Sequence, residues 1–263
     1  VFVYGWAGKL KMRGKNMYRF YVSKEQIAAD KIYIEGTDVN HIKNVLRMPP
    51  GEEVMVSFGK GMDYHCRIRT LEKDCIWLDV LEEVPAVTEL PVKIVLFQAL
   101  PKKDKMEWII QKAVELGAAE IVPVSSRRCV VRLDDKKKEK KLARWQTIVE
   151  AAAKQSGRGK IPEIHTVLSF SQALSYAEEL DTVLIPYELS DNMAESVEVM
   201  KKAAGGRSIG IFIGPEGGFE RSEVEAAMEA GAAPVSLGKR ILRTETAGMT
   251  ALSVLMFLIE GKE

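Results

Sequence analysis

The hydrophobic pattern divides the chain into two stretches with different rhythms. From residue 17 to residue 83, short β-branched and aromatic runs alternate with glycine turns, which predicts a small module rich in β-strands. Between the second and third runs, residues 37–47 carry apolar side chains at helical spacing, and Pro49-Pro50-Gly51 ends this predicted helix. Several strands with one helix predict a small β-barrel. The predicted strands are residues 18–22, 31–35, 53–58, 64–71 and 76–81.

Beyond a linker predicted at residues 84–91, which carry two prolines, strands and helices alternate. Such βαβ alternation predicts an α/β fold with a parallel sheet that is covered by helices on both faces. The predicted strands are residues 92–98, 120–124, 182–186, 208–213 and 233–237. The predicted helices are residues 102–116, 134–155, 171–179, 192–204, 220–230 and a last helix that ends near residue 259.

Three polar or glycine-rich segments directly follow predicted strands. They are Pro186-Tyr187-Glu188, residues 214–218 and residues 237–244. In open parallel sheets, ligands bind beyond the carboxyl ends of the strands. We therefore expect the three segments to lie at one edge of the sheet and to form one cleft.

Charge is distributed unevenly along a chain whose net charge is only +1. Residues 91–160 carry 17 Lys and Arg against 8 Asp and Glu, whereas residues 161–235 carry 4 against 13. This contrast predicts a basic surface and therefore a polyanionic partner. The lysine run within residues 136–141 is by itself explained by a solvated helix face. With 46% hydrophobic residues, the 263-residue chain can bury a proper core.

Cysteine and histidine usage argues against a stapled or metal-bound structure. The three cysteines show no CxxC spacing, and their odd number favours a reducing compartment without a disulfide framework or zinc site. The three histidines are too scattered to predict a metal centre, so we expect no metal. No segment predicts a membrane span, and we expect a cytoplasmic protein.

Residues 1–16 consist of a short apolar start followed by four basic residues, and they resemble neither a signal peptide nor a cleavage site. We expect an N-terminal extension, left by an upstream start or by cloning, that need not be ordered. The fold is then predicted to begin near Met17.

The turn Gly214-Pro215-Glu216-Gly217-Gly218-Phe219 lets backbone amides approach a ligand closely. Neither nucleotide-binding fingerprint, GxxxxGK[ST] or GxGxxG, is present, which argues against a nucleotide-dependent oxidoreductase. Glu216 at the centre of the turn disfavours a phosphate beside it. The turn suits a cationic or hydroxylic ligand, or a purely structural role.

Arg243 and Glu245 flank the predicted start of the last helix, where Thr244 or Thr246 can serve as the cap. Glu245 has a structural explanation, because a carboxylate in the first turn complements the helix dipole. Arg243 lies at the unfavourable end of that dipole. We therefore expect it to contact an external anion or Glu245.

These two loop motifs, Gly214-Pro215-Glu216-Gly217-Gly218-Phe219 and Leu237-Gly238-x-x-Ile241-Leu242-Arg243-x-Glu245-Thr246-Ala247, resemble those of the knotted SPOUT RNA methyltransferases. More narrowly, the chain resembles the RsmE family, which methylates N3 of a uridine in small-subunit (16S) ribosomal RNA. The match runs from Met17 onward, leaves residues 1–16 outside, and departs at Lys154, where an acid is frequent. Further matching segments are His41-Ile42-x-x-Val45-Leu46-Arg47 with Gly51, residues 111–117, Arg144-Trp145, residues 150–152, Gln155-Ser156-x-Arg158 and Ile161-Pro162.

The resemblance implies a PUA-like RNA-binding barrel over residues 17–83 and a SPOUT methyltransferase domain with a deep trefoil knot over residues 92–263. It also implies S-adenosylmethionine as cofactor, 16S ribosomal RNA or the small ribosomal subunit as partner, and a homodimer. The cofactor would be bound by Pro186, Ile213, Gly214, Glu216, Gly217, Gly218, Leu237, Gly238, Ile241, Leu242, Arg243 and Thr244.

On this interpretation, uridine N3 must lose its proton before it can attack a methyl group. Arg243 is the predicted cation that stabilises the resulting anion, and Glu245 or Glu216 is the predicted base. For each arginine assigned to RNA, the alternative is a surface ion pair. Arg158 lies in a turn with no obvious partner, which favours the RNA contact. The predicted RNA-binding residues are Arg19, Lys43, Arg47, Arg127, Arg128, Gln155 and Arg158.

Two other functions fit the same loops. A related enzyme could methylate a ribose 2′-hydroxyl or another RNA base with the same cofactor site. Alternatively, the protein could be a non-catalytic RNA-binding ribosome assembly factor. The presence of Arg243, Glu245 and both glycine-rich loops favours an enzyme.

Overall fold

A computed structural model describes residues 9–12, 15–28, 31–187 and 192–262 of the chain. The chain forms two compact units. The first unit comprises Val1–Glu89 and Ala153–Ile161, and the second comprises Leu90–Ala152 and Pro162–Glu263. The first unit therefore contains a segment from the middle of the sequence, which the predicted domain boundaries did not anticipate.

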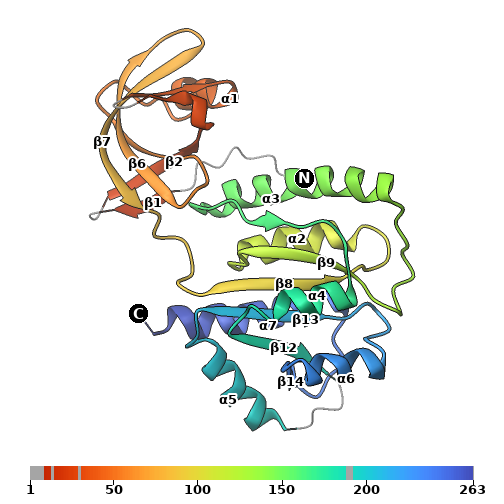
Figure 1. Cartoon of the computed structure of the whole chain (residues 1–263). Coiled ribbons are helices and arrows are strands. Elements are labelled where there is room, and N and C mark those ends of the chain that lie inside the picture. The colour runs from red at the N-terminus through yellow and green to blue at the C-terminus, as the bar shows by residue number, and fades with distance from the viewer. Residues whose placement is uncertain (1–8, 13–14, 29–30, 188–191, 263) are drawn as a thin grey trace. The chain divides into compact units, whose positions relative to one another are not determined.

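The first unit is built on one seven-stranded sheet, in which Figure 1 labels β1, β2, β6 and β7. The order of its strands is β1-β2-β5-β6-β7-β4-β3. Neighbouring strands are antiparallel except for β2 and β5, which run parallel. The strands are β1 Lys9–Met12, β2 Lys15–Tyr21, β3 Ile27–Ala28, β4 Lys31–Glu35, β5 Glu53–Ser57, β6 Met62–Leu71 and β7 Cys75–Pro85. The short helical segments are η1 Lys24–Gln26, α1 Thr37–Asn40 and the π-helical η2 His41–Val45.

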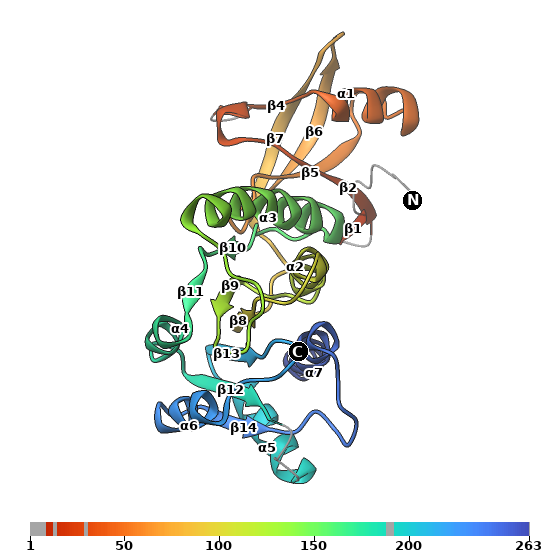
Figure 2. The ribbon, with the colours of Figure 1, turned by 90° about the vertical axis from the view of Figure 1, so that its right-hand side faces the viewer.

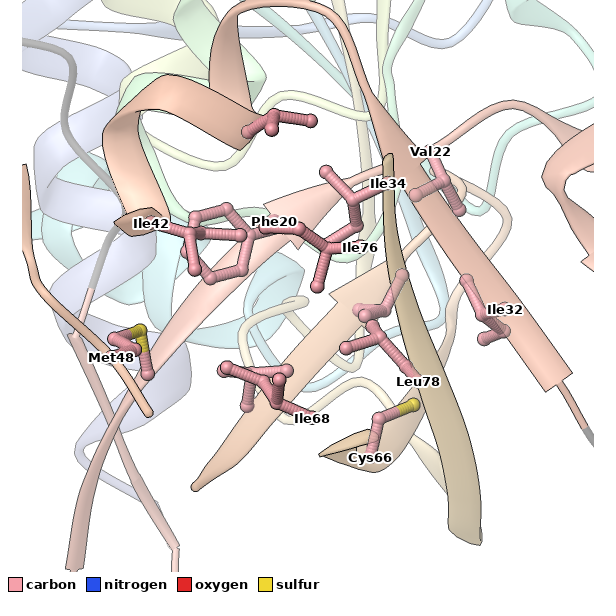
Figure 3. Close-up of a cluster of buried hydrophobic side chains, with 13 residues drawn as sticks. Phe20, Val22, Ile32, Ile34, Ile42, Met48, Cys66, Ile68, Ile76 and Leu78 are labelled. Carbon is pink, nitrogen blue, oxygen red and sulfur yellow. The ribbon is translucent and has the colours of Figure 1, made fainter. Parts of the chain in front are cut away.

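The core of this unit is a cluster of aliphatic and aromatic side chains enclosed by the curved sheet (Figure 3). Strand β4 shows how it forms, because its alternating pattern turns Ile32 and Ile34 inward, where they are 0% and 1% exposed. The segment after α1 adds Ile42, which packs on the same cluster. The predicted helix over residues 37–47 is confirmed in place, but it divides into α1 and η2.

Two boundaries differ from the prediction. Strand β1 pairs with β2 in antiparallel register, so the sheet begins at Lys9 and not near Met17. Strand β7 continues to Pro85, inside the predicted linker, because its partner β6 extends to Met62. In both cases a neighbouring strand lengthens the sheet beyond the hydrophobic alternation of the sequence.

The second unit has a sheet in the order β10-β9-β8-β13-β12-β14 in which the described pairs are parallel, with β11 also paired to β9. Helices α4 and α6 cover one face and α2 and α7 the other, which confirms the predicted α/β fold (Figure 2). The strands are β8 Lys93–Ala99, β9 Glu120–Ser125, β10 Glu163–Ile164, β11 Leu168–Ser169, β12 Thr182–Pro186, β13 Ser208–Ile213 and β14 Ala233–Val235. The helices are α2 Lys105–Glu115, α3 Asp135–Ser156, α4 Phe170–Ala177, α5 Met193–Ala203, α6 Arg221–Glu229 and α7 Thr244–Glu260.

The centre of this sheet is apolar on both faces. Phe97 of β8 and Phe212 of β13 stack with ring centroids 4.3 Å apart, and both side chains are fully buried. After the edge strand β14, the chain returns to the centre, where α7 packs against α2 and β13. This return brings the start of α7 next to the carboxyl end of β13.

Two further expectations concern membrane-spanning helices and the state of the cysteines. Among the residues described by the structure, no helix is both long and apolar enough to span a membrane. Cys66, Cys75 and Cys129 are all free thiols, as their spacing predicted.

A polar cluster lies at the start of β9, around Glu120. Its carboxylate accepts a hydrogen bond from the Tyr176 hydroxyl at 2.5 Å and lies 2.5 Å from Lys93 Nζ and 3.2 Å from His165 Nε2. Burial opposes ionisation, but the hydrogen bonds from His165, Lys93 and Tyr176 outweigh it and lower the pKa of Glu120 to about 2. Glu163 also lies near His165, a grouping that the scattered histidines of the sequence did not predict.

Replacing Glu120 with glutamine is expected to lower the free energy of unfolding by about 3 kcal/mol at neutral pH. The folded pKa is below the ordinary value, so the carboxylate stabilises the fold fully above about pH 4.5, and this contribution is lost as the pH falls toward 2. Urea unfolding at pH 7 and pH 3 should show the deficit of the variant shrinking by about half. Glu163→Gln, at a side chain 68% exposed, is the matched control and should change little at either pH.

Candidate active site

The carboxyl ends of β12, β13 and β14 meet at one edge of the second sheet, as strand direction predicted. The Tyr187 amide donates to the Val235 carbonyl at 3.0 Å, which joins the ends of β12 and β14. The Thr244 hydroxyl donates to the Gly214 carbonyl at 2.6 Å, which joins the start of α7 to the end of β13. Glu188 lies outside the described residues. The three predicted segments therefore do lie together.

The turn after β13 requires its glycines. A Cβ on Gly214 would lie 3.1 Å from the Gly218 carbonyl carbon and from the Phe219 amide nitrogen. Gly218 adopts a φ of +68°, and its amide donates to the Pro215 carbonyl at 2.8 Å. Phe219 anchors the end of the turn against Phe170, with ring centroids 5.2 Å apart. The turn is thus compact, and its shape is held by its own hydrogen bond and by the contact of Phe219 with Phe170.

The loop between β14 and α7 is open by comparison. Gly238 has a φ of +110°, and a Cβ there would meet nothing within 4 Å. In the described part of the chain, the amides of Ile241 and Leu242 have no hydrogen-bond partner. The Ile241 side chain is 91% exposed. The loop therefore presents free amide donors beside an apolar side chain, which suits a ligand with a flat apolar ring and polar edges.

Gln98, at the end of β8, connects these two loops and was not predicted. Its side chain is fully buried, and its Nε2 donates to the Thr244 hydroxyl at 2.9 Å, while Thr244 donates onward to Gly214. Thr244 is 5% exposed, so it holds the loops together and does not cap α7, whose N-cap residue is Arg243. Only the backbone of Thr244 is left for a ligand.

Lys105 pairs with both Glu216 and Glu245 and so brings them together. The sequence did not predict a role for Lys105. Lys105 Nζ lies 3.3 Å from Glu216 Oε1 and 3.1 Å from Glu245 Oε2, and the Lys102 amide donates to Glu216 at 3.0 Å. Burial alone would raise the pKa of Glu216, but backbone hydrogen bonds and Lys105 hold it below the ordinary value. An ionised, well-partnered carboxylate is a weak proton acceptor, so Glu216 suits a structural role better than that of a base.

Arg243 stands apart from this cluster. Its side chain is exposed and, within the described residues, makes no hydrogen bond or ion pair. Glu245 pairs with Lys105 instead, so of the two predicted partners of Arg243 only an external anion is left. A guanidinium at the start of a helix, without a carboxylate beside it, attracts negative charge at this edge.

Arg127 and Arg128 follow β9 at the same edge. Arg128 donates to the Gly217 carbonyl at 2.8 Å and so reaches the glycine turn. Arg127 lies 3.3 Å from Glu220 and donates to the Ser222 hydroxyl at 3.1 Å. Both guanidinium groups are at the surface, as an RNA contact requires.

The prediction that Arg19 and Arg158 bind RNA is wrong. Arg19 is 2% exposed and forms an ion pair with Asp63. Arg158 is 4% exposed, and its Nη2 lies 2.6 Å from Glu89 Oε2. A buried guanidinium needs a buried carboxylate, and these partners lie 44 and 69 residues away in the sequence. Both arginines therefore stabilise the first unit.

The other predicted RNA-binding residues belong to the first unit and stay accessible to different degrees. Arg47 and Gln155 are exposed. Lys43 is half-buried, and its ammonium donates to the Glu72 carbonyl at 2.9 Å. Their contact with RNA stays a prediction.

Comparison with known proteins agrees with this geometry. The family described as "RNA methyltransferase domain" matches residues 88–256, and the one described as "RNA methyltransferase PUA domain" matches residues 34–81. Ribosomal RNA small subunit methyltransferase E of Bacillus subtilis (strain 168) is 39% identical over 93% of this chain and 98% of its own length. The corresponding protein of Synechocystis is 33% identical over 93% of this chain and 78% of its own length.

Two solved structures with bound cofactor are similar over almost the whole chain. A ribosomal RNA small subunit methyltransferase E from Neisseria gonorrhoeae, bound to S-adenosyl methionine, is 34% identical over 92% of this chain and 98% of its own, with a TM-score of 0.70. A putative methyltransferase from Legionella pneumophila, in complex with the bound cofactor SAM, is 32% identical over 91% of this chain and 96% of its own, with a TM-score of 0.72.

Proposed function

The chain belongs to the ribosomal RNA small subunit methyltransferase E family of RNA methyltransferases, and from this premise we propose that it transfers a methyl group from S-adenosylmethionine to N3 of a uridine in 16S ribosomal RNA. One observation carries the choice of acceptor. The unpartnered guanidinium of Arg243 lies at the edge where the glycine turn and the open loop meet. A cation there matches an acceptor that becomes an anion before it reacts.

The residues at this edge fit the cofactor. The open backbone at Gly238, the free amides of Ile241 and Leu242 and the exposed Ile241 side chain suit an adenine ring and its polar edge. When bound, S-adenosylmethionine supplies a methyl group on a positively charged sulfur. The proposed contacts are Pro186, Ile213, Gly214, Glu216, Gly217, Gly218, Leu237, Gly238, Ile241, Leu242, Arg243 and the backbone of Thr244.

We assign the residues of the edge separate tasks in the reaction. Arg243 stabilises the negative charge that spreads over the uracil ring when N3 loses its proton. Lys105 and Glu216 keep the glycine turn and the start of α7 in register. Glu245 is the carboxylate that we propose as the proton acceptor, because Glu216 is held ionised by more partners.

The substrate is expected to contact both units. We propose that the PUA unit contacts RNA through Lys43, Arg47 and Gln155, and that Arg127 and Arg128 contact it in the second unit. The target base must be unpaired or flipped out, because N3 lies on its pairing edge. We place the reaction in the cytoplasm, where the free thiols are stable.

The test is transfer of a tritiated methyl group to purified small ribosomal subunits that lack their native methylations, followed by nucleoside digestion and chromatography. Label in 3-methyluridine would establish the reaction and the acceptor atom. Label in a ribose-methylated nucleoside or in another base would overturn the choice of acceptor. Cofactor binding without any transfer would favour the assembly-factor alternative.

We also propose that two copies of the chain associate through the exposed face of α2 and α7. These helices pack on each other in the second unit, yet Trp108 is 41%, Val254 37% and Phe257 75% exposed. An apolar group of this kind on two adjacent helices is typical of a protein interface. The family resemblance implies a homodimer, and this face is the one we assign to it.

Phe257→Asp is expected to convert the dimer largely to monomer, because it places a carboxylate in the proposed apolar contact. Size-exclusion chromatography with light scattering, over a range of protein concentrations, measures the change. Met228→Asp, at an exposed apolar residue of α6, is the control and should stay dimeric. Two results would contradict the assignment. The wild type could be a monomer, or Phe257→Asp could stay a dimer like the wild type and Met228→Asp.

A further inference from the structure

A cavity of about 360 Å³ lies beside the candidate active site, at the carboxyl end of β9. Its walls come from the end of β9, the loop that follows it, and the first turns of α4 and α6. The volume is within the range of small-ligand sites. The lining residues used below are Ser125, Arg127, Arg132, Phe170, Ser222 and Ala226.

The charge of this cavity is positive and only partly compensated. Arg132 donates to Ser125 Oγ at 3.3 Å, the Ser126 carbonyl at 3.5 Å and the Arg127 carbonyl at 3.2 Å, all of them neutral acceptors. Glu223 also lines the cavity, but both of its oxygens accept backbone amides, from Arg127 at 2.8 Å and from Glu220 at 3.0 Å. The guanidinium of Arg132 is therefore oriented on the wall and has no carboxylate partner among the described residues.

Two contacts connect the cavity to the glycine turn. Arg127 lines the cavity, while its neighbour Arg128 donates to the Gly217 carbonyl in the turn. Phe170 forms the apolar wall and contacts Phe219 at the end of the same turn. A molecule bound in the cavity would therefore lie next to a base positioned at the turn.

We propose that this cavity binds the nucleotide adjacent to the target uridine, with Arg132 and Arg127 contacting its phosphate. The Arg132 guanidinium is oriented by neutral acceptors and has no carboxylate partner among the described residues, which favours a phosphate. Arg127 adds positive charge, although its guanidinium also lies 3.3 Å from Glu220. The serine hydroxyls supply further donors, and Phe170 supplies an apolar wall for the base or sugar. This inference rests on the proposed function, because it takes the occupant to be part of the RNA substrate.

The test compares three full-length variants. Arg132→Ala removes the phosphate contact, Ala226→Phe fills the cavity without changing its charge, and Arg207→Ala is the control. Arg207 is an exposed arginine that precedes β13, at the opposite edge of the same sheet. The KM for undermethylated small subunits, kcat, the Kd for S-adenosylmethionine and the salt dependence of RNA binding are measured for each.

Arg132→Ala is expected to raise the KM about tenfold with little change in kcat or in the cofactor Kd, because a charged hydrogen bond to substrate is lost. Its slope of log affinity against log salt should fall by about 1. Ala226→Phe should raise the KM with the slope unchanged, and Arg207→Ala should match the wild type. A KM within about twofold of the wild type for both cavity variants, or an equal rise in Arg207→Ala, would overturn the proposal.

A free nucleotide carries the same phosphate, base and sugar as the RNA nucleotide proposed for this cavity. A titration with uridine 5′-monophosphate distinguishes a free nucleotide from RNA. The RNA assignment is overturned if the wild type binds uridine 5′-monophosphate and Arg132→Ala abolishes this binding while leaving the KM for small subunits unchanged. If the wild type does not methylate uridine N3, the proposed function fails. Filter binding of 16S ribosomal RNA to the wild type, Arg132→Ala and Arg207→Ala still decides whether the cavity contacts RNA.

Discussion

Replacing Arg243 with alanine is expected to lower the kcat of methyl transfer about 100- to 1,000-fold, the range measured when a group that stabilises transition-state charge is removed. The cofactor Kd should change much less, because the proposed contacts of the loop with S-adenosylmethionine are largely made by its backbone. Arg243 has no partner within the described residues, so its removal should leave the fold intact. Steady-state kinetics on undermethylated subunits, with calorimetric titration of the cofactor, measures both quantities.

Arg240→Ala is the matched control, because Arg240 is an exposed arginine of the same loop. We expect it to change kcat by no more than about threefold. Arg243→Lys should recover part of the lost rate, since it restores the charge without the planar guanidinium. Equal losses of kcat and cofactor affinity in Arg243→Ala would instead make Arg243 a binding residue.

Replacing Arg19 with methionine is expected to lower the free energy of unfolding of the first unit by about 3–5 kcal/mol, the cost of leaving one member of a buried ion pair alone. Arg19 and Asp63 are each 1% exposed at the side chain. Burial raises the pKa of Asp63 and Arg19 opposes it, so the carboxyl loses its compensation when the arginine is removed. Chemical denaturation followed by circular dichroism measures the loss.

Arg67→Ala provides the comparison, because Arg67 forms a solvent-exposed pair with Glu53 on the same sheet. It should cost about 0–1 kcal/mol. The double variant with Arg19→Met and Asp63→Leu should regain most of the stability, because no unpaired charge is left in the core. A single Arg19→Met variant as stable as Arg67→Ala would show that the pair contributes little.

The parallel sheet and its functional edge could be predicted from sequence because their signals are local. Largely apolar segments marked β8, β12 and β13, strands of five to seven residues, and the glycine turn followed β13 directly. Strand direction then placed the turn and the last loop at one edge, which the Thr244–Gly214 hydrogen bond confirms. The short strands β3, β10 and β11 were missed, because two residues carry no period.

The polar network of the site could not be predicted, because it depends on contacts between distant segments. Lys105 meets Glu216 and Glu245 only once α2, the glycine turn and α7 have assembled. Gln98 appeared to be the last residue of an ordinary strand. For the same reason Arg19 and Arg158 were assigned to RNA, since in sequence a buried arginine and an exposed one are alike.

The two segments of the first unit are synthesised at different times, because the whole of β8, α2 and β9 lies between them in the sequence. Residues 153–161 belong to that unit, where the carbonyls of Gly157 and Arg158 accept hydrogen bonds from Arg19 and Tyr21. These groups leave the ribosome long after Glu89, with the strands β8 and β9 synthesised in between. At about 5–20 residues per second, the wait lasts several seconds. The strands of the first unit are therefore all synthesised early, but the unit is completed only after translation of the second unit has begun.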